Sequence, residues 1–200
     1  MKKNVIISPS LLACDFSKIG DELKRIEDAG AEYIHLDVMD GIFVPNISFG
    51  QPVIKSLRKI SGLVFDVHLM ITDPIRYIDS FADAGADIIT VHLESADNIA
   101  RVLEYIKSKG IKASLSIKPK TPVAELKPYL PLLDMILIMS VEPGFGGQSF
   151  IEESTEKIRQ TKELTESLGY GNIDIEVDGG ISGKNVRQVI EAGANVIVAG

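Results

Sequence analysis

Tryptophan is absent from this chain of 200 residues, and cysteine occurs only once. The single cysteine, Cys14, excludes a disulfide within the chain and fits a cytoplasmic location. Long hydrophobic runs are also absent, since stretches such as Met135–Met139 are far shorter than the roughly 20 apolar residues of a membrane-spanning helix. The sequence therefore predicts a soluble protein that does not enter a membrane.

A surplus of basic residues is lacking as well. Lysine and arginine number 21 against 28 aspartate and glutamate residues, which gives a formal net charge of −7. This balance disfavours nucleic acid or an anionic membrane surface as the partner. We expect a small-molecule ligand, and a negatively charged one would have to be captured by a local site.

No glycine-rich, serine-rich or charged linker divides the chain, so we expect one domain over residues 1–200. Short apolar runs alternate with helical patterns from end to end. Eight strands are predicted, at Val5–Pro9, Tyr33–Asp37, Leu63–His68, Ile88–His92, Ala113–Ile117, Met135–Met139, Ile173–Val177 and Val196–Ala199. Seven helices are predicted, at Ile19–Ala29, Pro52–Ile60, Pro74–Ala84, Ala96–Lys109, Val123–Leu130, Glu153–Leu168 and Gly183–Ala192. The fifth helical pattern is short and weak.

A repeated Ala-Gly-Ala tripeptide supports this count. It occurs at 29–31, 84–86 and 192–194, each time between a predicted helix and a predicted strand, where glycine suits a left-handed residue. The offsets, 84 − 29 = 55 and 192 − 84 = 108, are about two and four times a unit of roughly 27 residues. Eight such units predict an α/β protein with the (β/α)₈ barrel, or TIM-barrel, fold rather than an open doubly wound sheet.

The sequence stops at Gly200, directly after the eighth predicted strand, so the final helix of such a barrel is missing. We expect the outer faces of the first and eighth strands to be exposed as a result, forming an apolar surface that favours association. We interpret the sequence as one shortened at its C-terminus.

Two histidines and two aspartates stand at predicted strand ends. His35 and Asp37 are two residues apart, so on a strand both side chains leave the same face. His68 ends the third strand and Asp178 follows the seventh, and in a barrel all four would meet at the carboxyl-end mouth. Two imidazoles and two carboxylates suit one divalent ion such as Zn²⁺, Fe²⁺, Co²⁺ or Mn²⁺. The alternative interpretation is hydrogen-bonded histidines beside ordinary loop aspartates.

Three other groups near this mouth are given lesser roles. His92 ends the fourth strand, which offers no carboxylate partner two residues away, and we interpret it as structural or as a support for the ligands. Glu94 and Asp40 are interpreted as solvated or network residues. Lys118 could form a Schiff base in principle but is more typical of a loop residue.

Glycine clusters follow the last three predicted strands. Gly144, Gly146 and Gly147 surround Phe145 after the sixth strand, Gly179 and Gly180 follow the seventh, and Gly200 follows the eighth. Barrels commonly build a phosphate site from backbone amides at these positions. Turn formation alone is the alternative, but the three clusters together predict a phosphate-bearing ligand.

Methionine and serine complete the predicted mouth. Met39, Met70 and Met139 end strands and would form an apolar, water-poor rim around the ion, although methionine is also common core filling. Ser10, at the end of the first strand, could donate a hydrogen bond to a substrate oxygen or could be an ordinary turn serine.

The sequence resembles a known family, ribulose-phosphate 3-epimerase, over its whole length. The resemblance rests on Ser8-Pro-Ser-Leu-Leu-Ala-Cys-Asp-Phe16, His35-Leu-Asp-Val-Met-Asp-Gly41 with Phe43-Val-Pro-Asn46, Asp66-Val-His-Leu-Met70, Ser140-Val-Glu-Pro-Gly-Phe-Gly-Gly-Gln148 and Val177-Asp-Gly-Gly180. It implies interconversion of D-ribulose 5-phosphate and D-xylulose 5-phosphate in the pentose phosphate pathway or the Calvin cycle.

The same resemblance implies roles for individual residues. His35, Asp37, His68 and Asp178 would bind the metal, and Asp37 and Asp178 would exchange protons with the substrate through an enediolate. Ser10, His68, the 144–147 loop and residues 178–180 would contact substrate. The family's phosphate site also uses a residue just past Gly200, which this sequence lacks. Family members form dimers or hexamers, so we expect a homo-oligomer.

Three alternatives remain open. A 3-epimerase of a hexulose phosphate such as D-allulose 6-phosphate would use similar residues. An aldolase-type lyase would cleave its substrate, and a Schiff-base version of it would use the amine of Lys118. Related barrels that decarboxylate or condense sugar phosphates carry an Asp-x-Lys-x-x-Asp pattern that the third strand here, Asp66–Ile71, does not have. The third alternative is a phosphate-binding barrel without catalytic activity.

Overall fold

The computed structural model describes residues 4–200, which form eight parallel strands. The strands are β1 Ile6–Pro9, β2 Tyr33–Met39, β3 Val64–Met70, β4 Ile88–His92, β5 Lys112–Ile117, β6 Met135–Met139, β7 Asp174–Asp178 and β8 Val196–Ala199. All eight predicted strands are confirmed: three have the predicted ends, and the ends of the other five shift by one or two residues. The sheet has the order β1-β8-β7-β6-β5-β4-β3-β2.

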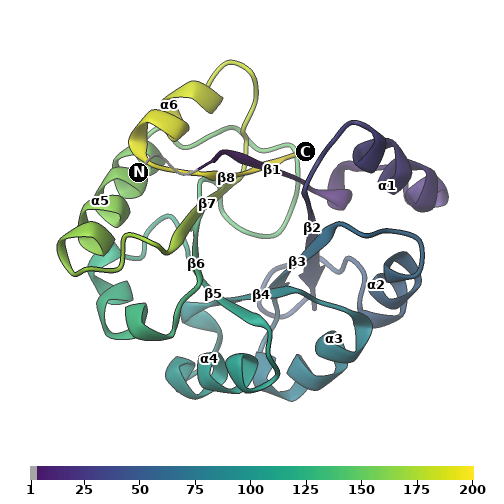
Figure 1. Ribbon diagram of the computed structural model, residues 1–200, viewed down its shortest axis with the longest axis horizontal. Coiled ribbons are helices and arrows are strands. Elements are labelled where there is room, and N and C mark those ends of the chain that lie inside the picture. The colour runs from purple at the N-terminus through teal and green to yellow at the C-terminus, as the bar shows by residue number, and fades with distance from the viewer. Residues whose placement is uncertain (1–3) are drawn as a thin grey trace.

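The sheet curls round until its two edges meet. β1 pairs with β8 from Ile6 opposite Val196 to Pro9 opposite Ala199. On the other side of β1, a single parallel bridge joins Ser10 to His35 of β2. The result is the predicted barrel, with helices around a ring of strands (Figure 1).

The helices form the outer layer. They are α1 Ile19–Asp28, α2 Gln51–Arg58, α3 Ile78–Ala84, α4 Ile99–Ser108, α5 Ser154–Ser167 and α6 Val186–Ala192. Short 3₁₀ helices lie at η1 Leu11–Ala13, η2 Phe16–Lys18, η3 Pro74–Tyr77 and η4 Leu93–Ser95, and a longer one, η5, spans Val123–Leu132. η5 replaces the weak fifth helix of the prediction. Pro128 and Pro131 lie inside it, and proline lacks the N–H that an α-helix needs in its interior.

The glycines of the Ala-Gly-Ala repeat have the backbone conformation that the sequence predicts. Gly30, Gly85 and Gly193 have φ of +87°, +101° and +128°. Each follows a helix and turns the chain towards the next strand, where a side chain would be strained.

Among the described residues, no helix lies outside β1 and β8 in the gap between α6 and α1 (Figure 1). The expected exposure is right for β1, whose Ile7 is 41% exposed. It is wrong for β8, because Ile197 is 1% exposed and belongs to the large apolar cluster between strands and helices.

The inside of the barrel changes character along its axis. Tyr33, Ile88, Met135 and Val196 form a small apolar cluster at the amino ends of their strands. Polar side chains then follow, all fully buried: His35, Asp66, Thr90, Ser114 and Glu176. Burying polar groups lowers the stability of a fold unless the groups are hydrogen-bonded or paired. Buried ionisable groups of this kind are common at functional sites.

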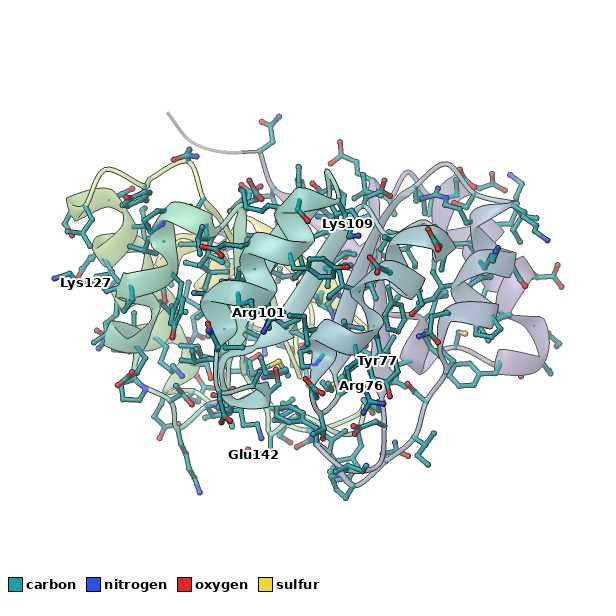
Figure 2. The ribbon with its side chains drawn as sticks, turned by 90° about the horizontal axis from the view of Figure 1, so that it is seen from below. Arg76, Tyr77, Arg101, Lys109, Lys127 and Glu142 are labelled. Atoms are coloured by element: carbon teal, nitrogen blue, oxygen red, sulfur yellow. The ribbon has the colours of Figure 1, made fainter. Side chains whose placement is uncertain are left out.

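The two ends of the barrel carry different loops. In the side view of Figure 2, Lys109, just before β5, lies in the upper half, whereas Arg76, Tyr77 and Glu142, which follow β3 and β6, lie in the lower half. The carboxyl ends of the strands therefore point to the lower end of that view. No helix among residues 4–200 is long and apolar enough to cross a bilayer.

Candidate metal centre and pocket

The four predicted ligands come together at the carboxyl ends of β2, β3 and β7. Their ligand atoms lie within 4.8 Å of one another. Asp37 Oδ1 lies 3.3 Å from His35 Nε2 and 3.0 Å from His68 Nδ1, and Asp178 Oδ2 lies 3.9 Å from both nitrogens. Strand register explains part of this closeness, because Asp37 and His68 are directly paired across β2 and β3.

These residues fit one divalent ion. They offer two ring nitrogens and two carboxylate oxygens from a nearly buried site, which is the donor set that zinc and other borderline metals prefer. His35 and His68 present different ring nitrogens, Nε2 and Nδ1, to the same point. Each has a contact at its other nitrogen, as metal-bound histidines usually do.

Charges within this cluster shift the pKa values of His35 and Asp37 far from their usual values. Burial favours a neutral His35, but the charges of Asp37 and Asp66 outweigh it and raise the pKa of His35 well above normal. Burial would raise the pKa of Asp37, yet His35 and His68 lower it. Asp37 is thus ionised at neutral pH, and a metal ion would have to displace the proton of His35.

Asp178 behaves in the opposite way. Burial and the neighbouring charge of Asp37 raise its pKa to about 6. Two carboxyl groups in one site, one with a lowered and one with a raised pKa, are typical of a catalytic base and a catalytic acid that work together.

A second layer of carboxyl groups lies beneath the ligands. Asp66 Oδ2 lies 2.7 Å from His35 Nδ1, and Glu176 Oε1 lies 3.6 Å from the same nitrogen. Both carboxyl groups are fully buried. Sequence reasoning gave neither a role, although a signal existed: each precedes a ligand by two residues, Asp66 before His68 and Glu176 before Asp178, so each shares that ligand's strand face.

His92 and Glu94 extend the cluster from His68. His92 Nε2 lies 2.8 Å from His68 Nε2, and Glu94 Oε2 lies 3.5 Å from His92 Nδ1. The supporting position of His92 agrees with the prediction. The statement that it has no carboxylate partner two residues away was wrong, because the turn of η4 directs Glu94 back to it. Burial lowers the pKa of His92 to about 4, so its ring is neutral at pH 7.

Ser10 lies beside the ligands, where its hydroxyl donates a 2.6 Å hydrogen bond to Asp37 Oδ2. Oγ of Ser10 in turn accepts a hydrogen bond from the backbone N–H of Leu12 at 3.2 Å. Asp37 therefore directs Oδ1 towards the ring nitrogens of His35 and His68, while its Oδ2 accepts the hydrogen bond from Ser10.

A pocket opens above this cluster. Asp37, Asp178 and Ser10 line it, and His68 does not. Met39, Met70 and Met139 also line it and are nearly fully buried. The predicted glycine positions belong to the same lining: Gly144, Gly146, Gly147, Gly179, Gly180 and Gly200, together with Phe145.

Two loops of this pocket approach each other too closely for larger residues. Gly180 has φ of +64°, and a Cβ there would lie 2.4 Å from the backbone nitrogen of Phe150. Across the mouth, the side-chain amide of Asn46 donates a 3.2 Å hydrogen bond to the carbonyl of Gly144. Glycine thus lets the β7 and β6 loops form one continuous wall.

Lysine and arginine are absent from the residues that the structure places in this pocket lining. Lys118 lies elsewhere, with its Nζ 4.1 Å from the ring centroid of Phe43. The interpretation of Lys118 as a loop residue fits this geometry, and the pocket has no amine for Schiff-base chemistry. An anion there would be bound by backbone groups.

Comparison with known proteins gives a consistent picture. Residues 6–200 match the ribulose-phosphate 3 epimerase family. The ribulose-phosphate 3-epimerase of Synechocystis sp. is 49% identical and aligns with 100% of this chain and 87% of its own length. That of Bacillus subtilis is 46% identical, with 97% and 89% covered. The chloroplastic ribulose-5-phosphate-3-epimerase of Arabidopsis thaliana is 47% identical, with 100% and 71% covered.

Among solved structures, a tryptophan synthase alpha-subunit from Pyrococcus furiosus has the same fold. Its TM-score is 0.76, with 19% identity over 100% of this chain and 89% of the other. At this level of identity the likeness supports the barrel architecture alone.

Proposed function

This chain belongs to the ribulose-phosphate 3 epimerase family, and we propose that it interconverts D-ribulose 5-phosphate and D-xylulose 5-phosphate with the help of one divalent metal ion. The observation that carries the proposal is the convergence of His35, Asp37, His68 and Asp178 beneath a pocket lined by glycine loops.

Epimerisation at carbon 3 removes a proton next to the carbon 2 carbonyl and returns one to the opposite face. Two acid and base groups are therefore needed, one for each face. Asp37 on β2 and Asp178 on β7 both line the pocket. The low pKa of Asp37 and the raised pKa of Asp178 support a resting state with the first ionised and the second able to hold a proton.

A bound divalent ion would supply Lewis-acid stabilisation of the negative charge that develops on the substrate oxygens. The chain's own residues orient the groups around it. Asp66 holds the His35 ring by its Nδ1, and Ser10 holds the outer oxygen of Asp37. The buried methionines Met39, Met70 and Met139 keep water away from the reacting carbons.

The phosphate of the substrate would be bound by the glycine loops of residues 144–147 and 179–180. Backbone N–H groups can approach an anion closely where no side chain intervenes. This capture fits both the acidic net charge and a lining without lysine or arginine among the described pocket residues.

The test is an assay of ribulose 5-phosphate conversion with and without a chelator. We expect activity to fall on chelation and to return on addition of Zn²⁺, Co²⁺, Fe²⁺ or Mn²⁺. Asp178→Asn should retain part of the metal affinity and lose epimerisation. Near-normal turnover of this variant would contradict the two-aspartate mechanism.

The substrate length and the assembly state are separate parts of the proposal. Turnover of a hexulose phosphate such as D-allulose 6-phosphate above that of ribulose 5-phosphate would reassign the substrate. The expected homo-oligomer, a dimer or a hexamer, is tested by sedimentation equilibrium, where a monomer would contradict it.

A further inference from the structure

The glycine loop after β6, residues 144–147, lies against the loop that follows β2. A Cβ added to Gly144 would lie 3.4 Å from Val44 Cβ and 3.4 Å from Pro45 Cδ, so the two loops are in close contact. Val44 is 2% exposed and belongs to the same small apolar cluster as two of the pocket methionines. The β2 loop, residues 40–48, therefore supplies a packed surface on which the glycine loop rests.

The β2 loop is held in shape by its own hydrogen bonds. Asp40 Oδ1 accepts from the backbone N–H groups of Ile42 and Phe43, both at 2.8 Å. Oδ2 of the same carboxylate accepts from the N–H of Thr72, in the loop after β3, at 2.8 Å. Ile47 pairs with Asp40 in an antiparallel bridge. One carboxylate thus ties the β2 loop to itself and to its neighbour, and the loop can serve as a fixed support.

Asn46 joins this support to the glycine loop. Its Nδ2 donates a 3.2 Å hydrogen bond to the carbonyl of Gly144, and its Oδ1 accepts a 2.9 Å hydrogen bond from the N–H of Ile47. An N–H only donates and a carbonyl only accepts, so these two partners fix which end of the amide faces Gly144. Within residues 4–200, no other side-chain hydrogen bond joins the two loops.

The Gly144 carbonyl and the Phe145 N–H belong to one peptide group. Peptide bonds in the described part of the chain are all trans, so these two groups point in opposite directions. Asn46 holds the carbonyl from a position outside the pocket lining, whereas Phe145 itself lines the pocket. Among residues 4–200, no backbone acceptor is found for the N–H groups of residues 145–147. These donors are therefore available to an anion.

A second side-chain amide holds other carbonyls of the same loop. Nε2 of Gln148 donates to the carbonyl of Glu142 at 2.7 Å and to that of Phe145 at 2.9 Å. A carbonyl oxygen turned towards a phosphate would repel it, so holding the carbonyls favours anion binding by the N–H groups. Gln148 acts within the loop, whereas Asn46 ties the loop to the rest of the mouth.

We propose that Asn46 positions the glycine loop for the phosphate group of the substrate, by holding the Gly144 carbonyl away from the pocket and so directing the N–H of Phe145 into it. This inference rests on the phosphate-binding part of the proposed function. Asn46 is a positioning residue, because it does not line the pocket and acts through the peptide group between Gly144 and Phe145.

Two variants of Asn46 test the proposal with inorganic phosphate as the probe. Asn46→Ala removes the hydrogen bond to Gly144, and the Kd for phosphate of the zinc-loaded protein should rise about 3- to 10-fold, as for one lost hydrogen bond. Asn46→Asp keeps the acceptor for Ile47 but sets a second acceptor against the Gly144 carbonyl, so its Kd should rise more than about tenfold. Isothermal titration measures both values, and a rise of less than threefold in Asn46→Ala would overturn the proposal.

Matched controls separate this bond from other effects. Asn172→Ala removes an exposed asparagine just before β7 and should leave the Kd unchanged. Ile42→Asp adds the same charge as Asn46→Asp to the same loop, at a side chain that is 78% exposed, and should also leave it unchanged. An equal rise in Ile42→Asp and Asn46→Asp would overturn the assignment to the Gly144 carbonyl.

Kinetics distinguish positioning of the phosphate from general damage to the site. In Asn46→Ala, KM for ribulose 5-phosphate should rise by the same factor as the phosphate Kd, with kcat and zinc affinity within about twofold of wild type. A fall in kcat with an unchanged KM would overturn the proposal.

The amide NMR signal of Phe145 gives a readout that does not depend on activity. Phosphate should shift this signal in wild type, and saturating phosphate should shift it less in Asn46→Ala. If wild type shows the shift but does not epimerise the sugar, the proposed function fails and the role of Asn46 stands. If phosphate leaves the Phe145 signal of wild type unmoved, the role of Asn46 is overturned whatever the activity.

Discussion

At the scale of single residues, Asp178 has a charge state that folding changes. Its pKa rises to about 6 in the folded protein because of burial and the charge of Asp37. The folded state therefore binds an extra proton between the unfolded pKa, near 4, and about 6. The contribution of this carboxyl to stability is fully present below the unfolded pKa and is lost as the pH rises through about 6.

We therefore expect Asp178→Asn to stabilise the metal-free protein more at pH 7 than at pH 4. Wild type must ionise a buried group at pH 7, and the amide need not. The difference in unfolding free energy should grow by up to roughly 3 kcal/mol between the two pH values, from about two pKa units. Urea unfolding in chelator measures it, with exposed Asp83→Asn as the control. A pH-independent difference would contradict the raised pKa.

Gly180 gives a second prediction at this scale. In Gly180→Ala, the new Cβ would meet the backbone of Phe150 at 2.4 Å with a strained positive φ. The β6 and β7 loops must separate, which should raise KM for the sugar phosphate at least about tenfold and lower stability by about 1–3 kcal/mol. Steady-state kinetics and thermal unfolding test this. Gly183→Ala, with open space around it and no positive φ, should change neither.

At the scale of elements, α5 and the loop after β5 are joined by one side chain. Nζ of Lys157 donates to the backbone carbonyls of Lys118, Pro119 and Thr121 at 2.7, 3.0 and 2.8 Å. The loop so held also carries the backbone N–H of Lys118 and the hydroxyl of Thr121, which donate hydrogen bonds to Glu94 Oε1. One ammonium on α5 thereby anchors the outermost support of the metal cluster.

Lys157→Met should release this loop. The thioether fills similar space but leaves three carbonyls without a donor, which should cost about 2–4 kcal/mol, as expected for lost hydrogen bonds to a charged group. Urea unfolding measures the loss. Lys127→Met is the matched control, since Lys127 is exposed on η5 and points away from the molecule (Figure 2). Equal effects of both substitutions would contradict the anchoring role.

The positions of helices and strands were predictable from the sequence where an element is buried on one face or on both. Strands such as β6, Met135–Met139, are apolar throughout because both faces are covered, and their type and limits follow from that pattern. η5 was less predictable, because its apolar residues fit a helix while Pro128 and Pro131 weaken the α-helical form. The two prolines argue against an α-helix, but they do not predict that the segment forms a 3₁₀ helix instead.

At the scale of the whole molecule, a metal ion bound by His35, Asp37, His68 and Asp178 would be a source of folding energy. These residues come from three strands and meet only in the folded state, so the proposed ion should stabilise the fold by mass action. At a zinc concentration 100 times the Kd, we expect about 2.7 kcal/mol and a clear rise in Tm. The variant His35→Gln should lose most of the rise. Scanning calorimetry measures it, and an equal shift in wild type and variant would point to non-specific binding.

The convergence of the site was predictable only through the barrel. His35 with Asp37 follows from strand periodicity, but His68 and Asp178 join them only once eight parallel strands close into a ring. Side-chain partners were harder to predict. Asp66 and Glu176 lie buried inside the barrel beneath the ligands, where the sequence analysis gave them no role, and the return of Glu94 to His92 depends on the turn of η4.

The closing seam of the barrel has a consequence for biosynthesis. β1 pairs with β8, the last strand along the chain, and its other neighbour is β2, which it meets through the bridge of Ser10 to His35. β1 is made before β8 and must therefore wait for it before its pairing is complete. Asp178 is also made after β6, so a nascent chain up to β6 would hold His35, Asp37 and His68 without the fourth residue of the proposed metal site.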